Sequence, residues 1–148
     1  MYDVIVIGGR CGGAPTAMLL ARAGAKVLLV DRAALPSDIP HGHFVHQHGP
    51  QRLAGWGLLD QVLATNCPPV TSITTDFGDG TLSGHDLVAD GVPLGVGPRR
   101  SQLDGLLVEA AVDAGAELRD RFVVDDCAWD GGRVTGIIGR DLRSGARI

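Results

Sequence analysis

A short apolar run near the N-terminus predicts a buried strand over residues 2–7, because it is rich in β-branched side chains and two glycines follow it. Residues 14–23 then have helical character, and Pro15 falls where the first turn of a helix tolerates proline. Gly24 ends this helix, and a second apolar strand is expected over residues 25–30. Strand, turn, helix and strand within about 30 residues form a βαβ unit, which requires a parallel sheet.

The middle of the chain is less regular. Residues 33–49 resemble a loop, and a helical stretch is expected over residues 50–65 with a break at the glycines of residues 55–57. Alternating apolar and polar residues from Ile73 onward, followed by Asp79-Gly80, predict a hairpin.

The clearest helical period covers residues 101–114. Its apolar positions fall on one face: Leu103, Leu106, Leu107, Ala110, Ala111 and Ala114. A short strand is expected over residues 116–118, and a second hairpin over residues 122–138. The pattern therefore predicts an α/β fold with a parallel sheet and an added antiparallel hairpin.

Composition excludes several classes of protein. The 148 residues carry a net charge of −4, without the concentrated basic face that nucleic-acid binding needs. No apolar run approaches the roughly 20 residues of a membrane-spanning helix. The three cysteines are odd in number and form no C-x-x-C pair, which favours a reducing, cytoplasmic location.

A glycine-rich turn joins the first strand to the first helix, with the sequence Gly8, Gly9, Arg10, Cys11, Gly12, Gly13. A helix N-terminus favours a pyrophosphate there, since it presents unpaired N–H groups and a partial positive charge. The turn departs from the G-x-G-x-x-G motif, because Arg10 occupies the middle glycine position. The arginine side chain either points outward or faces the ligand.

Asp31 ends the second predicted strand, 18 residues beyond Gly13. An acidic residue there accepts hydrogen bonds from an adenosine ribose and disfavours a 2′-phosphate, so NADP is not expected at this site. FAD and NAD remain open at this point, because both contain the same ADP moiety.

Three stretches resemble FAD-dependent oxidoreductases related to p-hydroxybenzoate hydroxylase and the geranylgeranyl reductases: DVIVIGGRCGGAPTAMLLARAGAKVLLVDR, HGPQRLAGWGLLDQVLATNCPP and PRRSQLDGLLVEAAVDAGAEL. A branch of that superfamily also carries arginine in place of the middle glycine. The resemblance covers nearly the whole chain and implies a Rossmann-like FAD/NAD(P)-binding fold. It implies that Gly8 to Gly13 hold the FAD pyrophosphate and that Asp31 binds the ribose. It further implies that Arg32 lies near the adenine and that Arg100 contacts the FAD.

Histidines 41, 43, 46 and 48 alternate in a loop and suggest a metal site, but few carboxylates are nearby, so no metal is expected. In the resembled family this loop runs toward the flavin, which makes His43 a candidate to line the isoalloxazine face.

The resemblance implies FAD as cofactor, NAD(P)H as electron donor and a small-molecule substrate, with hydroxylation favoured over reduction of a double bond. Two motifs that the family carries later in its sequence, an Asp-Gly pair and a Gly-Asp pair near the ribityl chain, find no match here. We therefore expect residues 1–148 to form a truncated FAD-binding domain without the substrate part. Two alternatives remain: a non-catalytic nucleotide-binding module and an NAD-binding Rossmann domain. A homo-oligomer is possible for the intact protein.

Overall fold

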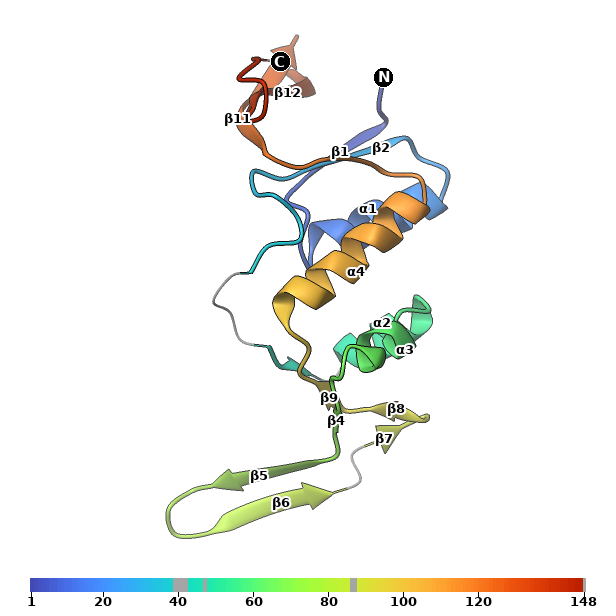
Figure 1. Ribbon diagram of the computed structural model, residues 1–148, viewed down its shortest axis with the longest axis vertical. Helices are drawn as coiled ribbons and strands as arrows, with labels where there is room; N and C mark the ends of the chain where they lie inside the picture. The colour runs from blue at the N-terminus through green and yellow to red at the C-terminus, as the bar shows by residue number, and fades with distance from the viewer. Residues whose placement is uncertain (39–42, 47, 86–87, 148) are drawn as a thin grey trace. The chain divides into compact units, whose positions relative to one another are not determined.

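The computed structural model describes residues 1–38, 43–46, 48–85 and 88–147. The chain divides into two compact units (Figure 1). The first comprises Met1–Asp38 and Asp104–Ile148, and the second is the intervening segment Ile39–Leu103.

A three-stranded parallel sheet forms the centre of the first unit, in the order β1–β2–β10. Strand β1 covers Val4–Ile7, β2 covers Val27–Val30 and β10 covers Glu117–Arg119. Helix α1, at Gly13–Arg22, connects β1 to β2 and completes the predicted βαβ unit. Strand β2 lies between the other two, and all four of its residues are buried.

The two faces of β2 are covered by different elements, since side chains alternate along a strand. Leu28 and Val30 form a buried cluster with Phe122. Val27 and Leu29 therefore point toward the opposite face of the sheet. Helix α1 packs against β1 and β2 through small and flexible buried side chains, namely Ala14, Ala17 and Met18.

Helix α4 spans Arg100–Asp113, close to its predicted bounds. Most of the predicted apolar face is buried, but Leu106 and Ala114 are only partly so. The buried face also contains Val108 and a carboxylate, Asp104, which the apolar pattern did not indicate. The buried stripe is therefore rotated toward residues 104, 108 and 111.

The predicted C-terminal hairpin is confirmed and consists of β11, at Phe122–Asp130, and β12, at Arg133–Asp141. Gly131 and Gly132 form its turn with φ values of 54° and 80°. Positive φ at both central residues matches the twist of the flanking strands.

The second unit contains two short helices, α2 at His48–Gly55 and α3 at Leu59–Ala64. The predicted break between them is confirmed, and Gly57 adopts a φ of 77° there. The described part of this unit also contains short strands: β3 (Val45–His46), β4 (Pro69–Val70), β5 (Ser72–Asp76), β6 (Thr81–His85), β7 (Val88–Ala89), β8 (Val92–Pro93) and β9 (Gly95–Val96). All their described pairings are antiparallel, including the predicted β5–β6 hairpin.

Among the described residues, none of the helices combines the length and apolar character that crossing a bilayer requires.

Candidate functional site

The glycine turn lies between the end of β1 and the start of α1. Gly8 has a φ of 100°, a conformation that L side chains rarely adopt, and its N–H donates to the Val30 carbonyl at 2.7 Å. A Cβ on Gly13 would lie 1.7 Å from the Gly8 carbonyl oxygen. The two glycines therefore permit a turn so tight that the helix starts directly against the strand end.

The start of α1 is exposed at Cys11 and Gly12. Gly12 is the N-cap residue and, as glycine, has no side chain to cap the helix. Pro15 lies within the first turn, where its missing N–H removes no helical hydrogen bond. The first N–H groups of a helix have no partner within it, so this end suits an anionic group.

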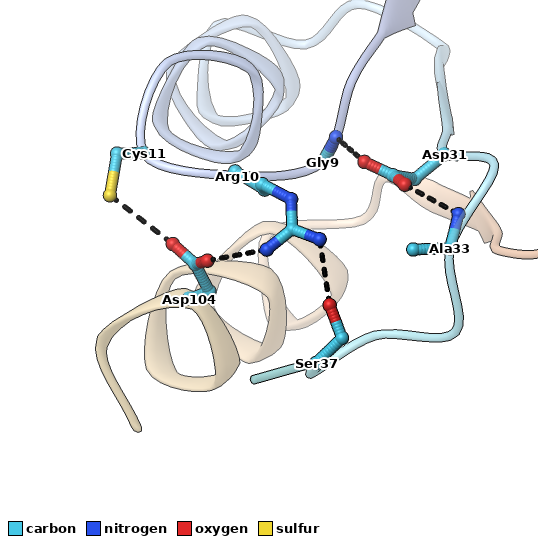
Figure 2. Close-up of polar contacts among 7 residues, drawn as sticks. All are labelled: Gly9, Arg10, Cys11, Asp31, Ala33, Ser37 and Asp104. Carbon is cyan, nitrogen blue, oxygen red and sulfur yellow. Dashed lines mark hydrogen bonds and ion pairs between the residues drawn. The ribbon is translucent and has the colours of Figure 1, made fainter. Parts of the chain in front are cut away.

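Asp31 follows β2 directly and is only 7% exposed. Its carboxylate accepts the Gly9 N–H through Oδ2 at 2.8 Å and the Ala33 N–H through Oδ1 at 2.8 Å (Figure 2). An ionised carboxylate has about four lone-pair sites, so each oxygen retains capacity for a further donor. Asp31 thus links the glycine turn to the end of β2 and still has acceptor capacity.

Arg10 does not extend into solvent but lies along the turn toward α4 (Figure 2). Its Nη1 lies 3.2 Å from Oδ2 of Asp104, and its Nη2 donates to the Ser37 hydroxyl at 2.7 Å. The thiol of the next residue, Cys11, lies 3.2 Å from Oδ1 of Asp104. Two consecutive turn residues therefore contact both oxygens of one carboxylate.

Three further residues were predicted to contact the cofactor: Arg32, His43 and Arg100. Arg32 is exposed next to Asp31 in the first unit. His43 is exposed and Arg100 is half-buried as the first residue of α4, and both belong to the second unit. The structure therefore brings together the six turn residues and Asp31, and it leaves His43 and Arg100 in a separate unit.

Sequence reasoning missed Asp104 and Ser37. Asp104 lies on the same helical face as Val108 and Ala111, and an acidic residue within an apolar face is a signal that it has a buried partner. Ser37 had no comparable signal, because it lies in an irregular loop.

The histidine-rich loop is only partly described, since His41 lies outside the described residues. His43, His46 and His48 are exposed. Among the described residues, no three or more histidine, cysteine or acidic side chains gather closely enough to hold a metal ion.

The profile of one protein family, described as an FAD binding domain, matches residues 1–147. The chain belongs to this FAD-binding family. The glycine turn fits the cofactor, because the strand–turn–helix arrangement and the acidic residue after β2 suit its pyrophosphate and ribose. The predicted FAD cofactor and Rossmann-like fold are thereby confirmed.

Curated relatives in this family are considerably longer than the chain. Aklavinone 12-hydroxylase of Streptomyces peucetius subsp. caesius is 37% identical over 91 residues, which cover 62% of the chain and 18% of the relative. Digeranylgeranylglycerophospholipid reductase 2 of Methanothermobacter thermautotrophicus is 30% identical over 145 residues, or 94% of the chain and 34% of the relative. The chain thus spans about a fifth to a third of these relatives.

A similar solved structure is the myxobacterial chondrochloren halogenase, an FAD-dependent enzyme. It is 26% identical and superposes with a TM-score of 0.85 over 99% of the chain and 34% of the halogenase. The FAD-binding domain described here therefore also occurs in flavin-dependent halogenases, besides hydroxylases and reductases.

Proposed function

We propose that this chain is the FAD-binding part of a flavin-dependent monooxygenase that receives electrons from NAD(P)H and acts on a small-molecule substrate. The observation that carries the proposal is the glycine turn at the start of α1, with Asp31 bonded to the Gly9 N–H. The 37% identity to an aklavinone hydroxylase favours oxygenation over other flavin reactions.

In this proposal the turn from Gly8 to Gly13 holds the pyrophosphate. The first backbone N–H groups of α1 face it, and the helix end contributes its partial positive charge. Asp31 accepts the ribose hydroxyls with its remaining lone pairs. When bound, FAD supplies the redox chemistry, and the chain binds and orients it.

The family resemblance implies roles for three further residues. Arg32 lies beside the adenine, Arg100 contacts the FAD from the start of α4, and His43 lines the isoalloxazine or substrate face. Residues 1–148 form one FAD-binding domain in this view, although the structure has two compact units. A cytoplasmic location and homo-oligomers complete the proposal. Cys11, Cys67 and Cys127 are not joined in disulfides, which suits a reducing compartment.

A second candidate function is the reduction of a carbon–carbon double bond. The similarity to the archaeal lipid reductase, which covers 94% of the chain, favours it. In that case electrons from the reduced flavin pass to a double bond without oxygen, whereas a monooxygenase requires oxygen. A binding-only module without catalysis is the third candidate.

The first test is a titration of the nucleotide-free chain with FAD, followed by flavin fluorescence and the visible spectrum. We expect saturable binding of one FAD per chain and competition by ADP, with NADPH competing less than NADH because Asp31 disfavours a 2′-phosphate. Failure to bind FAD would refute the proposal, and binding of NADH alone would indicate an NAD-type domain. If FAD binds and NADH or NADPH bleaches it under anaerobic conditions, the binding-only module is wrong.

A further inference from the structure

A buried carboxylate on α4 is attached to the glycine turn. Asp104 has no exposed surface, and its oxygens meet the Arg10 guanidinium and the Cys11 thiol at 3.2 Å each. The same guanidinium reaches Ser37, which lies in the loop after β2. Arg10 therefore connects three segments: the turn, α4 and the loop that follows Asp31 (Figure 2).

A carboxylate this deeply buried requires a charged or hydrogen-bonding partner, because desolvation of an isolated charge is strongly unfavourable. Arg10 supplies that partner with a side chain that is 25% exposed. Glycine at position 10 would leave the carboxylate without this guanidinium. Arg10, at the middle glycine position of the motif, thus supplies a cation to Asp104.

We propose that Asp104 is a positioning residue for FAD, acting through Arg10 and Cys11 to hold the turn in its pyrophosphate-binding conformation. This inference rests on the proposed function. The three contacts restrain two consecutive residues of the turn, so the backbone N–H groups are already oriented before the cofactor arrives. A preorganised site binds more tightly, because less conformational freedom is lost on binding.

The proposal predicts that Arg10 and Asp104 act as a pair. In Arg10→Gln the carboxylate loses its cation, and in Asp104→Asn the guanidinium loses its anion. We expect each single variant to weaken FAD binding about tenfold. The double variant replaces the ion pair by two neutral amides that can hydrogen-bond, so its affinity should return to within about threefold of wild type.

A loss of general stability would weaken the binding of every ligand, so the test needs a ligand that lacks the pyrophosphate. ADP and adenosine are measured by displacement of FAD from wild type and from each variant. We expect the single variants to weaken the binding of FAD and of ADP alike, while the affinity for adenosine changes less than about twofold. Cys11→Ala removes one contact without leaving a buried charge unpaired. It should lower the affinity for FAD and ADP by a smaller factor, about threefold, and leave the affinity for adenosine nearly unchanged.

The matched control is the exposed pair Asp125 and Arg140, joined by two contacts of 3.1 Å in the β11–β12 hairpin. Asp125→Asn, Arg140→Gln and their double variant should leave FAD affinity unchanged. Thermal unfolding of each variant shows which ones are folded. If Arg10→Gln does not fold, Asp104→Asn, Cys11→Ala and the double variant still decide the test.

Three outcomes would overturn the inference while leaving FAD binding intact. In the first, the losses of FAD affinity in the two single variants multiply in the double variant. In the second, folded variants bind FAD normally. In the third, the affinity for adenosine falls as much as the affinity for ADP. If the wild-type chain itself fails to bind FAD, the proposed function is wrong and the inference falls with it.

Discussion

The glycine turn and the β11–β12 hairpin contain the same two structural devices. Each has an Arg–Asp pair, and each has a glycine placed against a backbone carbonyl: Gly13 against Gly8, and Gly139 against Val123. The surroundings differ. Asp104 is fully buried at the turn, whereas the side chains of Asp125 and Arg140 are 30% and 53% exposed.

Burial and location, rather than residue type, therefore determine what each interaction contributes. An exposed ion pair is weak, since water and salt screen it. A buried one restrains its neighbours strongly, because breaking it leaves an uncompensated charge. Similarly, the close approach at Gly13 tightens the turn that we propose to hold the cofactor, whereas the close approach at Gly139 is part of the packing around Phe122.

The largest effect is expected from Gly13→Ala. Its new Cβ would lie 1.7 Å from the Gly8 carbonyl oxygen, and neither backbone segment can move without opening the turn. We expect FAD affinity to fall by at least about 100-fold and the free energy of unfolding to fall by about 3 kcal/mol. FAD titration and chemical denaturation measure the two effects.

Gly139→Ala is the matched control for this variant. Its Cβ would lie 2.3 Å from the Val123 carbonyl oxygen and 2.5 Å from a Phe122 ring carbon, so stability should fall similarly. FAD affinity of the folded fraction should change less than about twofold. Equal losses of FAD affinity in both variants would show that Gly13 acts through global stability alone.

An intermediate effect is expected from Asp31→Ala. The change removes the acceptor of the Gly9 and Ala33 N–H groups, at a position only 7% exposed. We expect about 2 kcal/mol of lost stability and a 10- to 100-fold weaker affinity for FAD, or about 1.5–3 kcal/mol.

Asp31→Asn is the conservative comparison, because the amide retains one acceptor oxygen and loses the charge. It should bind FAD more tightly than the alanine variant and less tightly than wild type. An alanine variant with unchanged FAD affinity would refute the ribose role of Asp31, and its loss of stability would then reflect the backbone contacts alone.

Local sequence signals were sufficient for the turn and for most elements around it. Gly8, Gly13 and Asp31 were predicted because a βαβ unit confines their spacing and chemistry to about 30 residues. The direction of Arg10 was left open, because its partner Asp104 is 94 positions away. The burial of Asp104 depends on tertiary packing, which a period of 3.6 residues does not specify to within one position.

The smallest effect is expected at the exposed pair of the hairpin, and it depends on pH. The Arg140 guanidinium donates to Asp125 and holds the pKa of that carboxyl below its usual value. An exposed pair of this kind should shift Tm by no more than about 2 °C at neutral pH.

The sign of the pH dependence follows from proton linkage. A carboxyl with a lowered pKa in the folded state takes up its proton first in the unfolded state. Its stabilising contribution is therefore complete above the unfolded pKa of about 3.9 and disappears as the pH falls through the lower, folded pKa. Asp125→Asn lacks this contribution at every pH. The difference in Tm between wild type and Asp125→Asn should consequently shrink as the pH falls below about 4, and Arg140→Gln should behave in the same way. A difference that stays constant into strong acid would mean that the pair contributes nothing through ionisation.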